Sequence, residues 1–229
     1  MRPVYVVIVA GGRGSRMQSA TPKQFISLTG KPVLWHTVSA FQRALPAARL
    51  IVVLPADTDA AQIRFLQEPP FASAVTLVTG GETRFHSVQN GLQSVPSDAL
   101  VLVHDGVRPL VSKTLIERCL RFAEEQDAAI PALPLTDSLC RVDNGRYTVV
   151  DRSTLFAVQT PQAFKASLLL PAFEQAYRDT FTDEASVVTA MGGTVLLVEG
   201  EKRNIKITTP EDLLLAELML QAGMQLSAQ

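Results

Sequence analysis

Short apolar runs rich in β-branched residues constrain the fold of this chain more than any other feature. They cover residues 4–9, 50–54, 75–78, 100–103 and 195–198, and each has the length and composition of a buried strand. The segments between them, at 34–41, 63–66, 88–95 and 115–123, carry apolar residues at helical spacing. This alternation predicts a three-layer α/β fold with a mostly parallel, Rossmann-like sheet covered on both faces. Ligands of such sheets bind beyond the carboxyl ends of the strands.

The composition is that of an ordinary α/β enzyme and narrows the partners. The 229 residues, 47% hydrophobic and 19% charged, fit a single domain over 1–229. A formal net charge of -1 disfavours nucleic acid or an anionic membrane as a partner. The first apolar run is too short to span a membrane and lacks a cleavage site, so we expect a cytoplasmic protein. Cys119 and Cys140 show no metal or disulfide spacing and are expected to be reduced.

One segment departs from the alternation and predicts a projecting β-hairpin. Residues 138–142 and 146–151 have strand signals on both sides of Asn144-Gly145, a typical hairpin turn. We place a β-arm at about 137–156. A lone hairpin is marginally stable in water, so a second copy of the chain is the simplest partner for it, as in a homodimer. The tail from Pro210 to about Ala222 predicts a closing helix.

The first strand runs directly into a glycine-rich loop, Ala10-Gly-Gly-Arg-Gly-Ser-Arg-Met17. Its glycines let the backbone approach phosphate oxygens and aim N–H groups at them. The loop lacks the lysine of a Walker motif and the third glycine of the dinucleotide fingerprint. Arg13 and Arg16 within it, and Lys23 after it, supply positive charge for a triphosphate. The alternative is a tight turn with solvated arginines.

The fourth strand ends in His104-Asp-Gly-Val-Arg-Pro109. A carboxylate at this strand end, facing a phosphate loop, suits a Mg²⁺ ion that bridges triphosphate oxygens, and Asp105 is the candidate ligand. Arg108 could bind the phosphate of an acceptor. The alternative is a turn capped by Asp105 and stiffened by proline. We interpret His104 as a packed strand residue rather than a base.

Other signals are weak when taken singly. The segment 80–87 could contact a base or ribose, with Ser87 opening the next helix, or Ser87 could be only a cap. Arg152 and Lys206 could be surface charges. Residues 160–162 resemble a turn, and 182–184 resemble a helix N-terminal capping box.

Together these segments resemble the 2-C-methyl-D-erythritol 4-phosphate cytidylyltransferases, within the sugar- and polyol-phosphate nucleotidyltransferases. The resemblance covers nearly the whole chain in order. It rests on the glycine-rich loop, Pro22-Lys-Gln-Phe25, Gly80-Gly81 with Arg84 and Ser87, His104–Pro109, Asp151-Arg152, Gln159-Thr-Pro-Gln162, Thr182-Asp-Glu-Ala-Ser186 and Asn204-Ile-Lys-Ile-Thr208. The loop and Pro-Lys-Gln are shared widely among nucleotidyltransferases, whereas the Asp-Arg, Thr-Pro-Gln and Asn-Ile-Lys elements are narrower.

The resemblance implies a step of non-mevalonate isoprenoid synthesis in which methylerythritol phosphate attacks the α-phosphorus of CTP. It implies Mg²⁺ on Asp105 and a homodimer whose arm closes part of the active site. The residues expected around CTP are Ala10, Gly11, Gly12, Arg13, Gly14, Gly81, Glu82, Ser87, Asp105 and Gly106. Those expected to stabilise the transition state are Arg16, Lys23 and Lys206. Those expected to meet the acceptor are Arg108, Ser138, Arg152, Thr160, Thr182 and Lys206.

Some positions depart from the commoner family pattern: Val9 for Pro, Glu82 for Asp, Gly106-Val107 for Ala-Ala and Ser138 for Thr. A pentitol-phosphate cytidylyltransferase, such as the ribitol 5-phosphate enzyme, would share the loop and the His-Asp-x-x-Arg-Pro segment, but Thr182-Asp-Glu-Ala-Ser186 favours methylerythritol. A rival of another class is a catalytically silent nucleotide-binding regulator. The joint presence of Arg16, Lys23, Asp105 and Lys206 argues against it.

Overall fold

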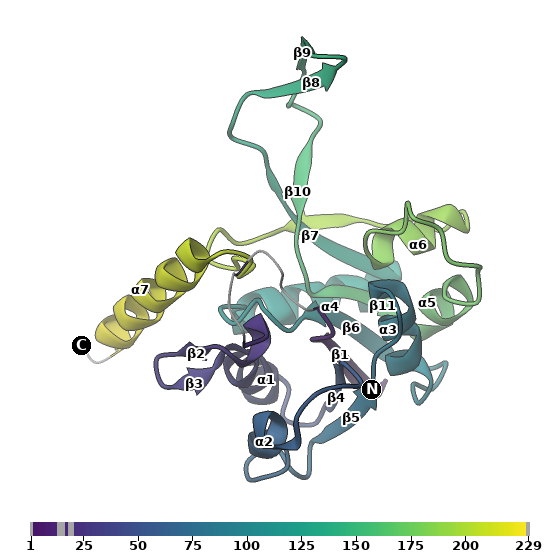
Figure 1. The fold of residues 1–229 in the computed structure, drawn as a ribbon. Coiled ribbons are helices and arrows are strands. Elements are labelled where there is room, and N and C mark those ends of the chain that lie inside the picture. The colour runs from purple at the N-terminus through teal and green to yellow at the C-terminus, as the bar shows by residue number, and fades with distance from the viewer. Residues whose placement is uncertain (1, 13–16, 18–20, 228–229) are drawn as a thin grey trace.

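An eight-stranded sheet forms the centre of the molecule (Figure 1). The structure is a computed structural model that describes residues 2–12, 17 and 21–227. The strands of this sheet are β1 (Val4–Val9), β4 (Arg49–Leu54), β5 (Val75–Thr79), β6 (Leu100–Asp105), β7 (Ala128–Pro134), β10 (Phe156–Val158), β11 (Gln162–Lys165) and β12 (Leu197–Glu199). Two shorter sheets pair β2 (Ser27–Leu28) with β3 (Lys31–Pro32) and β8 (Leu139–Asp143) with β9 (Arg146–Val150).

Strands are added on one side of β1 first and on the other side afterwards, so the order of the strands reverses at β1. The order is β10-β7-β11-β6-β1-β4-β5, with β12 paired to β7. Strand β1 lies between β4 and β6 and is parallel to both, and β4 is parallel to β5. Strand β11 is antiparallel to β6 and β7. The mostly parallel sheet is therefore confirmed, and its switch point lies beyond the carboxyl end of β1, where such sheets bind ligands.

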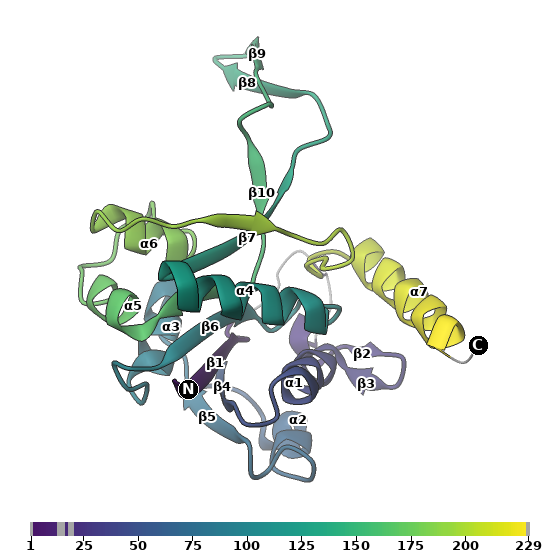
Figure 2. The same cartoon turned by 180° about the vertical axis from the view of Figure 1, so that it is seen from behind.

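Helices cover the two faces of the sheet, which confirms the predicted three layers. They are α1 (Val33–Ala44), α2 (Ala60–Ile63), α3 (Arg84–Leu92), α4 (Lys113–Gln126), α5 (Ala166–Ala172), α6 (Glu184–Ala190) and α7 (Pro210–Ser227), with the 3-10 turns η2 (Lys23–Phe25) and η3 (Arg64–Leu66). Because side chains alternate along a strand, Val6 and Ile8 of β1 pack with α1 and α4, and Tyr5 and Val7 pack with α3, α5 and α6. Figure 2 shows α4 in front of the sheet.

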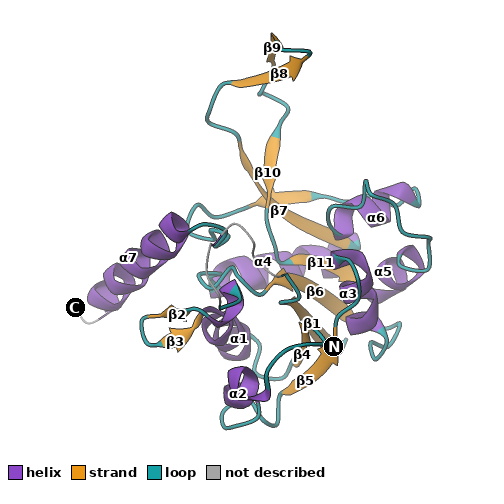
Figure 3. Ribbon diagram, viewed as in Figure 1, coloured by secondary structure: helices purple, strands orange, loops and turns teal. Residues whose placement is uncertain are grey.

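The predicted hairpin is confirmed and projects well beyond the sheet (Figure 3). Strands β8 and β9 pair from Leu139 opposite Val150 to Asp143 opposite Arg146. Asn144 and Gly145 both have positive φ, 48° and 75°, which is the backbone of a type I′ turn and matches the twist of the two strands. The paired strands β7 and β10 connect the hairpin to the main sheet. The hairpin exposes Tyr147 and Val149 by 68% and 69%, so its apolar side chains face solvent in one copy of the chain.

The structure corrects several boundaries. The last strand covers Leu197–Glu199 rather than 195–198, and the closing helix continues to Ser227. Helix α3 ends at Leu92, so Val95 lies beyond it. Strands β7, β10 and β11 were not predicted, because β7 is rich in alanine and proline and the other two are very short. Residues 160–162 are not a simple turn, because Gln162 begins β11.

Both cysteines are free, as expected. Cys119 is a core residue of α4, and burial raises the pKa of its thiol to about 12. Cys140 is exposed on the hairpin. No helix among the described residues is both long and apolar enough to cross a membrane.

Candidate active site

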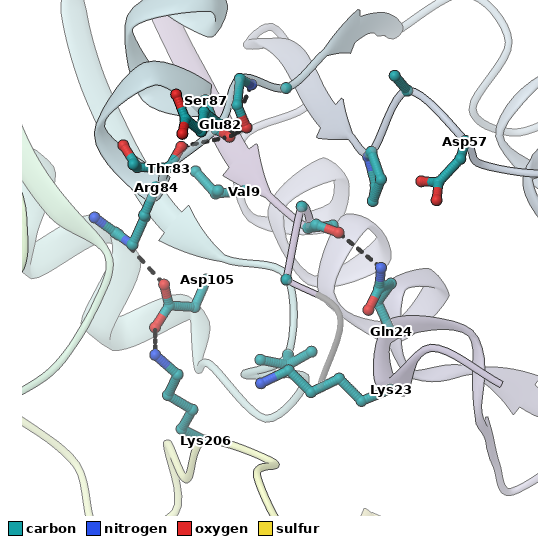
Figure 4. Close-up of a pocket in the computed structure, with 18 residues that line it drawn as sticks. Val9, Lys23, Gln24, Asp57, Glu82, Thr83, Arg84, Ser87, Asp105 and Lys206 are labelled. Carbon is teal, nitrogen blue, oxygen red and sulfur yellow. Dashed lines mark hydrogen bonds and ion pairs between the residues drawn. The ribbon is translucent and has the colours of Figure 1, made fainter. Parts of the chain in front are cut away.

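A cavity of about 800 Å³ lies beyond the carboxyl ends of β1, β4, β5 and β6 (Figure 4). Each strand sends one short loop into its wall, so residues that are distant in sequence face one another. The lining residues are Val9, Ala10, Gly11, Gly12, Lys23, Gln24, Pro55, Ala56, Asp57, Gly80, Gly81, Glu82, Thr83, Arg84, Ser87, Asp105, Val107 and Lys206. The predicted ligand edge of the sheet is therefore hollowed, and it brings Lys23, Asp105 and Lys206 to one cavity.

The start of the glycine-rich loop is anchored by its neighbours. The Ala10 N–H donates to the Val53 carbonyl at 2.9 Å, and the Ala10 carbonyl accepts from the Gln24 side chain at 2.8 Å. Gln24 is 1% exposed, so this amide acts as a fixed support and not as a surface group. Sequence reasoning missed Gln24. Arg13, Gly14 and Arg16 lie outside the described residues.

The second glycine segment is held by Ser87. The Ser87 hydroxyl accepts from the Gly81 N–H at 3.1 Å and donates to the Thr83 carbonyl at 2.9 Å. A Cβ at Gly81 would lie 2.4 Å from the Cβ of His86, so only glycine fits there. Thr83 is the N-cap of α3 and Ser87 lies within the helix, so the expectation that Ser87 opens or caps α3 was wrong. Glu82 is exposed on the cavity rim.

Asp105 ends β6 with its carboxylate surrounded by cations. Its Oδ2 lies 2.9 Å from Lys206 Nζ and 3.5 Å from Arg108 Nε, and its Oδ1 lies 3.3 Å from Arg84 Nη2. Burial by itself raises the pKa of Asp105, but the charges of Arg84, Lys206 and Arg108 lower it by more, so the net pKa is well below its usual value. Asp105 is therefore a carboxylate in the neutral pH range.

Arg84 and Glu184 were not among the predicted site residues, although both stand in motifs that carried the resemblance. Arg84 begins α3 and Glu184 begins α6. Arg84 Nη1 donates to Glu184 Oε1 at 2.5 Å, and Nη2 donates to Oε2 at 3.2 Å. Burial lowers the pKa of Arg84, but the carboxylates of Glu184 and Asp105 raise it above its ordinary value. The guanidinium thus stays charged at the cavity wall.

His104 and Thr160 support Asp105 from the side away from the cavity. The Thr160 hydroxyl accepts from the Asp105 N–H at 3.1 Å and lies 3.0 Å from His104 Nδ1. His104 Nε2 lies 3.1 Å from the Arg108 carbonyl. Burial lowers the pKa of His104 to about 3, so the imidazole is neutral and structural. The interpretation of His104 as a packed residue is confirmed.

The remaining predicted acceptor residues do not line this cavity. Arg108 is 9% exposed and donates to the Asn204 carbonyl at 2.7 Å. Thr160 is 4% exposed. Ser138 and Arg152 are exposed near the foot of the hairpin, where Arg152 donates to the Thr136 carbonyl. Thr182 is exposed beside the N-terminus of α6.

Gly106 lies behind the cavity and brings two strands close together. Its N–H donates to the Val9 carbonyl at 2.8 Å, and a Cβ at this position would lie 3.0 Å from the Cβ of Ala10. A larger residue there would push β6 away from the loop that follows β1. The structure therefore gives Gly106 a packing role beside its predicted nucleotide contact.

A divalent cation fits this site only together with phosphate. The described residues contain no group of three His, Cys, Asp or Glu side chains able to hold a metal ion. Mg²⁺, however, is commonly held by one or two carboxylates, water and substrate phosphates. Asp105, which points into a cavity lined by a glycine-rich loop, provides such a carboxylate.

Comparisons with known proteins agree with this geometry. The family model described as 2-C-methyl-D-erythritol 4-phosphate cytidylyltransferase matches residues 4–222. This chain belongs to that family. A cytidylyltransferase of this description from Phocaeicola vulgatus is 44% identical over 216 residues, which are 94% of this chain and 99% of the relative. One from Bacillus velezensis is 42% identical and covers 95% of both chains.

Solved structures of the family have the same fold. A 4-diphosphocytidyl-2C-methyl-D-erythritol synthase superposes with a TM-score of 0.81 at 31% identity, over 96% of this chain and 100% of that one. The cytidylyltransferase from Thermus thermophilus has a TM-score of 0.75 at 36% identity, over 94% and 98% of the two chains. The cavity described above is thus the candidate active site of a cytidylyltransferase.

Proposed function

We infer that this protein transfers a cytidylyl group from CTP to 2-C-methyl-D-erythritol 4-phosphate, giving CDP-methylerythritol and pyrophosphate. Family membership over residues 4–222 supports the reaction. The observation that carries the assignment of the site is one cavity that holds a glycine loop, Lys23, Asp105 and Lys206 together. These groups are the anion cradle, the metal-binding carboxylate and the cations that nucleotidyl transfer requires.

The nucleotide is assigned to the part of the cavity between the two glycine segments. Gly11 and Gly12 offer backbone to the phosphates, as do Arg13 and Gly14 in our proposal. Gly81, Glu82 and Ser87 border the opposite side, where the base and ribose would bind. A Cβ added to Gly11 would lie 3.4 Å from Ser87 Oγ, so the two segments approach closely enough to enclose one ligand.

The chemistry requires alignment more than proton transfer. An oxygen of the acceptor phosphate attacks the α-phosphorus, the new P–O bond forms, and the bond to the β-phosphate oxygen breaks, so pyrophosphate leaves with that electron pair. The attacking group is already an anion, and no strong base is needed. Lys23, Lys206 and Arg16 are proposed to neutralise the charge that grows on the α-phosphoryl oxygens.

Mg²⁺ is proposed to bind Asp105 together with the triphosphate, and when bound it would neutralise charge on the phosphate oxygens. Two side chains hold the Asp105 carboxylate in the absence of the cation. Arg84 holds Oδ1 of Asp105, while Lys206 meets Oδ2 from a side chain that is 39% exposed and able to turn toward a phosphate.

We propose that the acceptor is bound partly by the arm of a second copy. Ser138 and Arg152 are exposed near the foot of the hairpin and do not line the cavity of their own chain. The exposed apolar residues Val142, Tyr147 and Val149 would be covered in a homodimer. Arg108 and Thr182 complete the proposed acceptor site, and Thr160 takes part only indirectly, through its hydrogen bond to the Asp105 N–H. The cytoplasm is the proposed location.

The deciding experiment measures pyrophosphate release from the purified protein with CTP and Mg²⁺. Methylerythritol phosphate and ribitol 5-phosphate are offered in parallel. We expect turnover with the first and little with the second. Turnover with ribitol phosphate alone would assign the protein to the pentitol branch, and absence of turnover with either would favour a silent regulator.

A further inference from the structure

Glu184 carries a carboxylate that is completely buried, and burying such a group costs free energy. It is the first residue of α6 and has no exposed surface (0%). Removing a carboxylate from water costs several kcal/mol unless it is paired and hydrogen bonded, and a buried ion pair is often no more stabilising than apolar residues of the same volume. A contribution to folding stability therefore explains poorly why a glutamate is buried at this position.

The ion pair of Glu184 with Arg84 indicates what this buried carboxylate does. Arg84 donates Nη1 to Oε1 at 2.5 Å and Nη2 to Oε2 at 3.2 Å, which fixes the plane of the guanidinium group. The same Nη2 lies 3.3 Å from Asp105 Oδ1. Arg84 can turn fully onto Asp105 only by giving up one of its bonds to Glu184. Glu184 thus limits Arg84 to a single contact with Asp105.

The N-terminus of α6 is itself fixed to the sheet. The Gln162 side chain donates to Asp183 Oδ2 at 2.8 Å and accepts from the Ala185 N–H at 2.9 Å. Gln162 is fully buried on β11, opposite Val103 of β6. Asp105 ends that same strand β6. Glu184 and Asp105 are therefore held in one rigid frame, and Arg84 bridges them.

We propose that Glu184 is a positioning residue for cytidylyl transfer. By binding both Nη atoms of Arg84, it keeps the guanidinium on Oδ1 of Asp105. Oδ2, which lies 2.9 Å from Lys206 Nζ and 3.5 Å from Arg108 Nε, then becomes available to the cation that accompanies CTP once Lys206 turns to a phosphate oxygen. The inference rests on the proposed role of Asp105 in binding that cation. Without the charge of Glu184, Arg84 pairs with both oxygens of Asp105 and competes with the cation.

The test compares CTP binding with Mg²⁺ and with EDTA, by calorimetry and without an acceptor so that no turnover occurs. Glu184→Gln keeps the volume and removes the charge. We expect CTP affinity in Mg²⁺ to fall on the order of 10- to 100-fold, the range found for residues that orient metal ligands. Affinity in EDTA should not fall, because the substitution removes a buried negative charge behind Arg84 and so weakens repulsion of the triphosphate. Equal losses under both conditions would show a merely structural role and overturn the proposal.

Two further variants isolate the pathway through Arg84. In an Arg84→Met background, Glu184→Gln should cause no additional loss, because the group through which it acts is gone. Gln89→Met is the matched control: it removes a hydrogen bond of 2.7 Å from α3 to the Phe173 carbonyl without touching Arg84. It should leave the Mg²⁺ dependence of CTP binding unchanged. A further loss from Glu184→Gln in the Arg84→Met background would overturn the proposal.

Asp105→Asn separates this inference from the function on which it rests. If Asp105→Asn leaves Mg²⁺-dependent CTP binding intact, the proposed role of Asp105 fails. If Asp105→Asn weakens that binding and Glu184→Gln does not, only the positioning role fails. Should Glu184→Gln not fold, Arg84→Lys keeps the charge but loses the fork, and the same Mg²⁺-specific loss is expected. No loss in Arg84→Lys would then overturn the proposal.

Discussion

The ammonium group of Lys206 lies 2.9 Å from Oδ2 of Asp105. Lys206 and Asp105 both line the cavity, and Lys206 comes from the segment between β12 and α7. The lysine therefore covers the oxygen that faces the proposed cation position. Binding of a nucleotide with its cation requires Lys206 to exchange this carboxylate for a phosphate oxygen.

This pairing predicts that the protein alone binds divalent cations poorly. Asp105 already has the cations of Arg84, Lys206 and Arg108 around it, and these repel a further positive charge. Titration with Mn²⁺, followed by its paramagnetic resonance signal, should show no saturable site below millimolar concentration. Addition of CTP should create one site, and Asp105→Asn should weaken it. A tight site in the ligand-free protein would contradict this arrangement.

Lys23→Ala should lower kcat by on the order of a hundredfold, because it removes one preorganised charge from the cavity. The folded state should be little changed. Lys31→Ala is the matched control, since Lys31 is exposed and contacts the ring of Trp35. Steady-state pyrophosphate release checks both variants. Near-normal kcat in Lys23→Ala would remove its assigned role.

The arm leads to a prediction about acceptor binding. Arg152→Ala should raise the KM for methylerythritol phosphate far more than it changes the affinity for CTP, because Arg152 lies outside the cavity proposed to bind the nucleotide. Initial rates at varied acceptor, together with CTP binding by calorimetry, check this expectation. An equal loss of both affinities would show that Arg152 has another role.

Mixing two impaired variants tests whether the arm acts across a dimer. A heterodimer of Lys23→Ala and Arg152→Ala subunits has one site with both substitutions and one site with neither, if Arg152 serves the partner's cavity. Random exchange of subunits should then restore up to about a quarter of the wild-type activity. Recovery near zero after confirmed exchange would place Arg152 in its own subunit's site.

Buried His104 predicts a loss of stability in acid. Burial lowers the pKa of His104 from 6.5 to about 3, so below pH 6.5 the unfolded chain binds a proton that the folded chain excludes. The free energy of unfolding should therefore fall as the pH drops through 6.5 toward 3, by about 2 kcal/mol between pH 7.5 and 5.0. Urea unfolding at pH 7.5 and 5.0 measures the difference, which should shrink in His104→Asn. An unchanged difference would show that His104 titrates normally.

Many of the secondary-structure elements could be predicted from local sequence patterns. Residues 4–9 are predicted and observed as β1, because a six-residue run rich in β-branched residues is too short for a helix and suits a strand buried on both faces. The hairpin turn at Asn144-Gly145 was equally clear, since few residue pairs accept positive φ at both positions. β11 was missed because its four residues carry little periodicity, and neighbouring strands induce its conformation.

The residues of the candidate site also fall into those that the sequence predicts and those that it does not. The glycines, Lys23 and Asp105 could be chosen from the sequence. Each stands at the end of a strand, in the loop that follows it or beside a phosphate motif, and strand ends in a parallel sheet converge. Arg84 and Glu184 could not be assigned roles that way. They are 100 residues apart in the sequence, and neither local segment indicates that the two side chains form an ion pair.

The sequence by itself therefore determined the alternation of strands and helices, the turn of the arm and the choice of the first loop as a candidate phosphate site, because these depend on neighbouring residues. Only the tertiary structure decided that Lys206 and Arg84 meet the two oxygens of Asp105, that Thr160 supports Asp105 from behind, and that Arg152 lies away from the cavity of its own chain. Such contacts join segments brought together by sheet pairing and core packing, and their geometry is set by the fold as a whole.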